Sequence, residues 1–207
     1  MLGATDSGGT MAGGTKRLPR AVREQQMLDA AVEVFSARGY HDTSMDAIAA
    51  AAEISKPMLY LYYGSKDELF SASIAREGQR FVEAITPAAD PTLTPREQLR
   101  AALLGFLGFV DEHRSSWMVL YRQSMGEQAF ATQVRTSRAR LIELTAKLLE
   151  SSTKDPEPGT DFGIMAVALV GAGEAVADRV AGGEIEVEKA ADLLENLAWR
   201  GLAGKKK

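Results

Sequence analysis

Residues 43–70 read TSMDAIAAAAEISKPMLYLYYGSKDELF, and this stretch decides the fold that the sequence predicts. The alanine-rich run 46–52 favours a short helix whose small side chains let another helix approach closely. A second short helix is expected over 56–63, because a serine precedes it, a proline lies in its first turn and Gly64 follows its end. The turn 53–55 joins them, and two short helices joined by a three-residue turn form a helix-turn-helix.

Longer helices are expected on both sides of this motif. Before it, the apolar residues of 20–38 recur at the spacing of one helical face, and Gly39 follows where a left-handed C-terminal cap is favoured. Thr43 lies three residues ahead of Asp46, an arrangement typical of a capping box at the start of the first short helix. After the motif, a serine-capped helix over 65–85 begins with acidic residues, which the helix dipole favours at that end.

Behind these helices the chain alternates between apolar helical segments and breaks that contain proline or glycine. Thr94 and Glu97 form a complete capping box around a proline, so a new helix begins there. No strand-like alternation of useful length occurs, which leaves an all-α fold of about nine helices. The five helices expected after the first proline-rich break cover 95–113, 116–125, 127–151, 161–181 and 187–199.

The pattern predicts a chain in two parts. Residues 18–66 form a three-helix domain built on the helix-turn-helix, and residues 67–207 form a larger, all-helical domain. Residues 1–17 hold almost no large apolar side chains, so they cannot offset the entropy cost of ordering and are expected to be a disordered tail.

The composition excludes several functional classes. The chain of 207 residues holds no cysteine and two histidines, His41 and His113, which removes thiolate sites and argues against a metal centre or a histidine triad. We therefore expect no enzyme activity, no metal and no cofactor. No apolar run reaches the roughly 18 to 20 residues that span a bilayer, and the first residues lack the apolar core of a signal peptide. The sequence therefore predicts a cytoplasmic protein with no membrane partner.

The helix expected over 56–63 has an unusual outward face. On a helical wheel Leu59 and Tyr63 point inward, whereas the other tyrosine, leucine and methionine side chains of this helix point outward. Such a face fits a helix that contacts DNA, because hydroxyls donate to phosphates and apolar tips contact thymine methyls. The alternative, that Tyr60 and Tyr62 only complete the core, stays open. The residues predicted to point outward are Pro57, Met58, Tyr60 and Leu61, flanked by Lys56 and Tyr62.

The stretch 27–70 also resembles the DNA-binding domain of the TetR family of bacterial regulators. It carries the family's GY..TS...IA, SK..LY.YY and SKDELF patterns in register and in the same order. One position departs from the family, because Glu53 stands where a glycine is usual in the turn between the two short helices. The resemblance implies a homodimer on double-stranded DNA, and since dimeric helix-turn-helix proteins read two half-sites, we expect a palindromic operator.

The resemblance implies roles for single residues in this binding. Lys56, Pro57 and Tyr60 are expected to face base edges or the groove wall, whereas Tyr62 and Lys66 are expected to hold phosphates. Thr43 and Ser44 are expected to add phosphate contacts beside a helix N-terminus. The segment 16–70 holds seven basic and eight acidic residues, so binding must depend on a few well-placed contacts. The predicted DNA-binding residues are Thr43, Ser44, Ser55, Lys56, Pro57, Tyr60, Leu61, Tyr62 and Lys66.

In the TetR family the second domain usually encloses a small-molecule pocket. Here aromatic and methionine side chains gather in one region with few charges, which suits an apolar ligand, although ordinary core packing is the alternative. The spellings of 17–31 and 55–66 are similar to actinobacterial family members that control fatty-acid synthesis in response to long-chain acyl-CoA, which implies a fatty-acyl effector. The same apolar lining would equally suit a drug or a steroid. The predicted lining residues are Phe106, Phe109, Trp117, Met118, Tyr121, Met125 and Phe130.

The helix expected over 161–181 is apolar on nearly every side and must be covered on every side. One cover is the protein's own core, and a second subunit can supply the other. The resemblance implies that this helix and the one over 187–199 form a dimerising four-helix bundle. The predicted interface residues are Val167, Val170, Gly171, Leu194 and Leu197.

Three functions are compatible with the sequence. The first is a regulator, repressor or activator, whose hydrophobic ligand alters its affinity for DNA, with the helix over 65–85 as the connection between domains. The second is a DNA-binding dimer without an effector. The third is an all-helical enzyme or lipid-binding protein that never contacts DNA, although no catalytic constellation in the sequence supports it.

Overall fold

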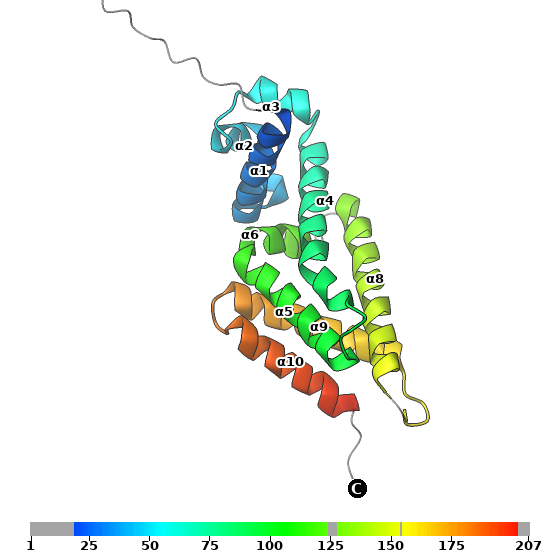
Figure 1. The fold of residues 1–207 in the computed structure, drawn as a ribbon. Coiled ribbons are helices and arrows are strands. Elements are labelled where there is room, and N and C mark those ends of the chain that lie inside the picture. The colour runs from blue at the N-terminus through cyan, green and yellow to red at the C-terminus, as the bar shows by residue number, and fades with distance from the viewer. Residues whose placement is uncertain (1–18, 124–127, 154, 203–207) are drawn as a thin grey trace, which may run out of the picture.

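All regular elements in the described part of the chain are helical, in a computed structural model that describes residues 19–123, 128–153 and 155–202 (Figure 1). The predicted all-α class is confirmed, and the tail predicted over 1–17 lies outside the described residues. No helix in these ranges is long and apolar enough to cross a membrane. The elements are α1 (Arg20–Asp42), α2 (Met45–Ala51), α3 (Lys56–Tyr62), α4 (Lys66–Ile85), the 3₁₀ turn η1 (Thr86–Ala89), α5 (Pro95–Glu112), α6 (Arg114–Trp117), the π-helical segment η2 (Met118–Gln123), α8 (Gln128–Ser152), α9 (Phe162–Ala181) and α10 (Val187–Leu202).

The helix-turn-helix forms as predicted, but with a different cap at the start of α2. The Oγ atom of Ser44 accepts a hydrogen bond from the Ala47 backbone N–H at 3.2 Å. The expectation that Thr43 caps α2 is wrong, because its buried hydroxyl donates to the Gly39 carbonyl at 2.6 Å. Gly39 has φ +81°, the positive value predicted for it, and it interrupts the helical backbone near the end of α1.

The first core lies among α1, α2, α3 and the beginning of α4. Phe35 and Phe70 meet edge to face with their ring centroids 4.7 Å apart, a favourable arrangement for aromatic pairs. Leu59 is fully buried, as predicted for the inward side of α3. The largest fully buried side chains of this core are Met27, Phe35, Ile48, Leu59, Leu69 and Phe70.

The turn between α2 and α3 contains a strained residue. Glu53 has φ +53°, the one positive value at a non-glycine residue in the described ranges. An L-residue pays about 1 kcal/mol or more in this left-handed conformation, which glycine adopts without steric cost. Two backbone hydrogen bonds hold the turn, from Glu53 to the Ala50 carbonyl at 3.1 Å and from Ile54 to the Ala49 carbonyl at 3.0 Å.

α5 is the centre of the second core and packs against α4, α8, α9 and α10. It begins with the predicted capping box, in which the Glu97 carboxylate accepts a hydrogen bond from the Thr94 backbone N–H at 2.7 Å. Hydrogen bonds from the Thr94 hydroxyl and backbone lower the pKa of the Glu97 carboxyl. Further along α5, Gly105 allows close contact with α4, because a Cβ there would collide with the Ala84 carbonyl.

Two segments join the two cores. α4 begins beside α1 to α3 and ends beside α5 (Figure 1). The other is the pair α6 and η2, where Val119 is fully buried in the first core while Trp117 belongs to the second. One continuous helix over 116–125 was expected here, but α6 ends at Trp117 and the backbone continues as a π-helix. The division of the chain between residues 66 and 67 stays a prediction, and the first core uses a side chain well beyond it.

Candidate nucleic-acid interface and partner surfaces

α3 lies at one end of the molecule and leaves one face open to solvent (Figure 1). Leu61 exposes 82% of its surface and Tyr60 exposes 43%. Lys56 and Pro57 are exposed as well, at the beginning of the same short helix. The outward face of α3, defined here as Lys56, Pro57, Tyr60 and Leu61, therefore combines a cation, a hydroxyl and apolar tips, the groups that contact phosphates and base edges.

Lys56 makes an ion pair with α2. Its Nζ atom lies 2.7 Å from Oδ2 of Asp46, and both side chains are substantially exposed. The hydrogen bond to Asp46 raises the pKa of the Lys56 ammonium. The pair holds the lysine at the first turn of α3. Nothing in the spacing of these two residues indicated this contact.

Three other residues of α3 and its end face the first core. Tyr63 is half-buried, as predicted. Met58 was expected to point outward, but it is half-buried because α1 covers it, and its sulfur accepts a hydrogen bond from Arg23 Nη1 at 3.2 Å. Tyr62 packs against the same core, and the Arg20 guanidinium lies 5.3 Å from the centroid of its ring. Tyr62 thus presents only part of its surface, beside a basic residue of α1.

Two predicted phosphate contacts are used inside the protein. The Lys66 ammonium donates to the carbonyls of Tyr40 at 2.8 Å and Thr43 at 3.1 Å, and lies 4.4 Å from the Tyr40 ring centroid. A cation at this position satisfies carbonyls left open at the end of α1. The Thr43 side chain is buried. The structure does not bring these two side chains to the outward face of α3.

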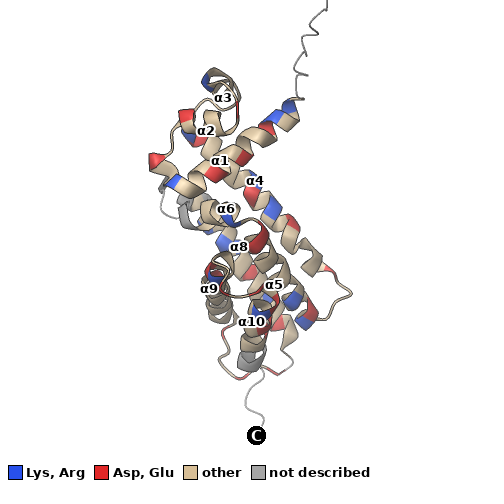
Figure 2. Cartoon of the chain, turned by 90° about the vertical axis from the view of Figure 1, so that its left-hand side faces the viewer, with Lys and Arg blue, Asp and Glu red and all other residues tan. Residues whose placement is uncertain are grey.

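The serines that precede α2 and α3 remain on the surface. Ser44 and Ser55 are both exposed, and the Ser55 side chain makes no capping hydrogen bond. Around them, lysine and arginine alternate with aspartate and glutamate along α1 to α3 instead of forming a patch of one sign (Figure 2). This mixture agrees with the near-balanced charge of the segment, so a positive potential at this surface depends on individual exposed cations and not on a patch.

In the second domain, four of the predicted lining residues come together. Phe106 meets Trp117 with centroids 5.5 Å apart, and Trp117 stacks on Tyr121 at 4.6 Å, while Phe109 is joined to Phe106 through Phe81. Met118 is half-buried nearby in η2. Met125 and the Phe130 side chain lie outside the described residues. These aromatic rings form part of the second core.

Polar groups border this aromatic cluster. Trp117 Nε1 donates to Asp178 of α9 at 3.1 Å. Arg138 of α8 binds Glu174 of α9 through two nitrogens, at 2.7 and 2.9 Å. Burial, and to a smaller extent a hydrogen bond with Glu174, raises the pKa of Tyr121 to about 12. The cluster is therefore apolar with a charged pair at its edge, a chemistry suited to an amphipathic ligand.

A groove of about 520 Å³ opens between α4 and α5. The residues that line it are Arg80, Glu83, Ala84, Leu104, Gly105, Gly108, Phe109, Glu112 and His113. Phe109 is the one predicted lining residue that borders it.

The predicted dimer residues divide into exposed and buried ones. Val167 and Leu197 expose 48% and 58% of their surface, and the backbone at Gly171 has open space above it. Val170 and Leu194 belong instead to the side of their helices that is buried within the chain. Two exposed residues were missed, Ile164 and Leu193, each one turn away from a predicted one. The α9–α10 apolar face is defined here as Ile164, Val167, Gly171, Leu193 and Leu197.

Two family descriptions match the chain. Residues 27–73 match the bacterial regulatory proteins of the tetR family. Residues 95–201, just over half of the chain, match the tetracyclin repressor-like C-terminal domain. The first match covers the helix-turn-helix and the second covers the domain that carries the aromatic cluster and the α9–α10 apolar face.

Known proteins similar to the chain are transcriptional regulators by description. A TetR-like transcriptional regulator from Rhodococcus sp. RHA1, known from a crystal structure, is 78% identical, with a TM-score of 0.86 over 91% of this chain and 100% of that one. The transcriptional activator FasR of Mycolicibacterium smegmatis is 38% identical over 130 residues, 61% of this chain and 59% of FasR. The chain thus spans about three fifths of that curated relative. The structure of Bacillus subtilis FadR in complex with stearoyl-CoA has a TM-score of 0.70 at 16% identity, over 84% of this chain and 96% of that one, which shows a shared fold.

Proposed function

Because the chain belongs to the TetR family of bacterial regulatory proteins, we propose that it is a ligand-responsive transcriptional regulator that binds a palindromic operator as a homodimer. The observation that carries the proposal is the outward face of α3, whose four side chains are exposed to solvent. The role places the protein in the cytoplasm, where bacterial DNA lies.

In this proposal α3 enters the major groove. Lys56 reads a base, since lysine donates well to the acceptors of guanine, and Leu61 contacts thymine methyls. Tyr60 and the hydroxyls of Ser44 and Ser55 reach the groove wall and the phosphates. With acids and bases nearly balanced in this part of the chain, two modules per dimer are needed to engage enough phosphates.

The α9–α10 apolar face supports a dimer. Exposed large apolar side chains on two adjacent helices are the usual content of a homodimer interface, in which each copy covers the other. Gly171 lies within this face with open space above it, so a second helix can approach closely there. A Gly171→Leu variant should fold normally and dimerise more weakly. An intact dimer in sedimentation of this variant would count against the proposed interface.

The effector in this proposal is an amphipathic molecule with a long apolar chain, of the long-chain acyl-CoA class. Supporting it are the Trp117–Tyr121 stack with the Arg138–Glu174 pair at its edge, and the 38% identity to FasR. The FadR fold, which this chain shares, holds stearoyl-CoA in that protein. Such a ligand alters affinity for DNA only if it binds the two conformations of the dimer unequally.

The DNA function is tested by selecting duplexes from a random pool and measuring their affinity in mobility-shift assays. The double variant Lys56→Ala with Tyr60→Ala should fold and dimerise normally but lose specific binding, because its outward face no longer reads base edges. Glu33→Ala, which removes an exposed acid elsewhere on α1, is the matched control. Operator affinity unchanged in the double variant would contradict the assignment of α3.

The effector is tested by titrating the dimer with stearoyl-CoA and, as the matched control, with free coenzyme A. Binding of stearoyl-CoA alone, with a change in operator affinity, is the expected result. DNA binding with no response to either compound would favour a DNA-binding dimer without this effector. Ligand binding with no selected duplex would favour a helical lipid-binding protein.

A further inference from the structure

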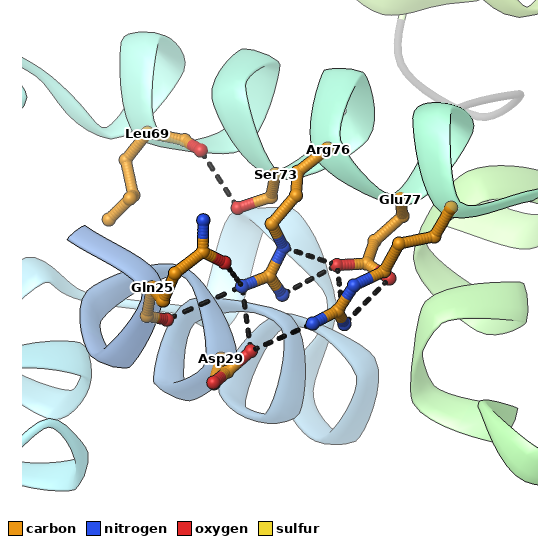
Figure 3. Close-up of polar contacts among 7 residues, drawn as sticks. Gln25, Asp29, Leu69, Ser73, Arg76 and Glu77 are labelled. Carbon is orange, nitrogen blue, oxygen red and sulfur yellow. Dashed lines mark hydrogen bonds and ion pairs between the residues drawn. The ribbon is translucent and has the colours of Figure 1, made fainter. Parts of the chain in front are cut away.

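α4 carries a group of charged residues on the side that faces α1. Glu77 is fully buried, although it is a carboxylate, and two arginines of the same helix surround it (Figure 3). Arg76 lies 2.5 Å from its Oε1, and Arg80 lies 3.4 Å from its Oε2. A buried carboxylate is tolerated only when it is paired and hydrogen-bonded, so both arginines are needed to keep Glu77 in place.

The pairing orients Arg76 toward α1. Its Nε and Nη2 atoms face Glu77, which leaves Nη1 pointing across the gap between the helices (Figure 3). There Nη1 donates to Asp29 Oδ1 at 2.6 Å and to the backbone carbonyl and the side-chain oxygen of Gln25, each at 3.3 Å. The Arg76 side chain is nearly buried, so water competes weakly for these bonds. One guanidinium thus links buried Glu77 to two residues of α1.

α1 in turn holds the helix-turn-helix. Gln26 donates to the Ala52 carbonyl at the end of α2 at 2.9 Å, and Arg23 donates to the sulfur of Met58 in α3. Burial and the charge of Glu24 raise the pKa of Tyr63 at the end of α3, and the charge of Arg76 lowers it. A change in the angle between α1 and α4 therefore moves α3 with it.

We propose that Arg76, oriented by Glu77, is a positioning residue that fixes the angle of the DNA-reading module on α4. The contacts of Arg76 with Gln25 and Asp29 form an interdomain clamp on the side of α1 that faces α4. In a dimer this clamp sets how far apart the two α3 helices lie, and therefore which half-site spacing the protein accepts. This meaning rests on the proposed function, whereas the angle itself can be measured without DNA.

The variants must remove the clamp without leaving a buried charge. Arg76→Met alone would leave the buried Glu77 carboxylate with only the longer contact to Arg80, at 3.4 Å, and could unfold the protein. The double variant Arg76→Met with Glu77→Met replaces the pair by apolar side chains of similar size, which proteins often tolerate. Asp29→Ala is a second variant that cuts the clamp at its solvent-exposed end and leaves Glu77 paired. Glu33→Ala, one turn further along α1, is the matched control.

The angle is measured by single-molecule energy transfer between a dye on α1 and a dye on α10. The chain has no cysteine, so Arg38→Cys and Glu188→Cys would be its only thiols. Labelled chains are mixed with excess unlabelled chains, so that transfer is within one chain. We expect a broader or shifted distribution of transfer efficiency in the double variant, a smaller change in Asp29→Ala, and none in Glu33→Ala.

Thermal unfolding followed by circular dichroism gives the midpoint of each variant. The transfer measurement is then made far below that midpoint, so that a loss of stability alone does not change the transfer efficiency. The proposal is overturned if the distribution of transfer efficiency in the folded double variant has the same width and the same mean as that of the parent. With a selected operator, the parent should discriminate against one added central base pair more strongly than the double variant does. If no operator is found, the DNA function fails and the transfer result still decides whether the clamp exists.

Discussion

Two surfaces of the molecule expose large apolar side chains, and they differ in what surrounds those side chains. On α3, Leu61 lies beside a lysine, a tyrosine hydroxyl and exposed serines. On α9 and α10, the exposed large apolar side chains are Ile164, Val167, Leu193 and Leu197. The first surface can satisfy phosphates and base edges, whereas the apolar side chains of the second fit a copy of itself. Exposure alone does not identify a partner, and the neighbouring polar groups do.

The contrast between the two surfaces would be wrong if acidic substitutions on the α9–α10 apolar face had no effect on dimerisation. We expect Val167→Glu with Leu197→Glu to dissociate the dimer, because each subunit would bury carboxylates against apolar side chains. Losing the burial of the Val167 and Leu197 side chains in the dimer costs at least about 3 kcal/mol, which raises the dissociation constant roughly a hundredfold. Sedimentation equilibrium measures the change, and Val82→Glu, at a comparably exposed valine on α4, should leave the dimer intact.

The first surface is tested by removing its cation. Lys56→Ala should weaken specific DNA binding by about 1–3 kcal/mol and relax the preference at one base pair in each half-site. Affinity for random duplex should fall less, because that affinity depends on the sum of phosphate contacts. Mobility shifts on a selected operator and on its single-base variants separate the two effects. An equal loss on all duplexes would make Lys56 a phosphate contact.

The turn that presents α3 can be made less strained without touching its outward face. Glu53→Gly should stabilise the protein by about 1 kcal/mol, because glycine adopts positive φ at no steric cost, although it loses more entropy on folding. Urea unfolding measures the change, and operator affinity should stay the same. A loss of stability would mean that the Glu53 side chain makes a contribution larger than the strain.

The smallest effect concerns the acid that competes with DNA for Lys56. Asp46→Asn should raise affinity for all duplexes a few-fold, since it removes a negative charge and frees the lysine, while stability changes by less than about 1 kcal/mol. The gain should shrink as salt is added. Titrations at two salt concentrations measure it, and a selective gain on the operator alone would show that Asp46 acts on base reading.

Much of the fold was predictable because its signals are local. The capping box at Thr94, the serine before α4, the positive φ of Gly39 and the inward position of Leu59 follow from short-range geometry and appear as expected. The prediction for Thr43 was wrong because Ser44 lies one residue nearer the helix and takes the cap, and the buried hydroxyl bonds to α1.

The remaining differences depend on which element covers which. A helical wheel places Met58 outward, but it does not contain Arg23 of α1, which lies against the methionine. A helix apolar on nearly every side does not disclose which side its own chain covers, so Val170 and Leu194 were placed at the interface although they are buried. The contact of Arg76 with Asp29 spans 47 residues of sequence and has no local signal.

The burial of Val119 in the first core has a consequence for synthesis on the ribosome. α1 to α4 can begin to form as soon as they emerge, but their packing stays incomplete until residue 119 has been added. A nascent or prematurely ended chain that stops before this residue therefore carries a loosened reading module. For the proposed function, this means that the helix-turn-helix reaches its full packing only when part of the second core has also been synthesised.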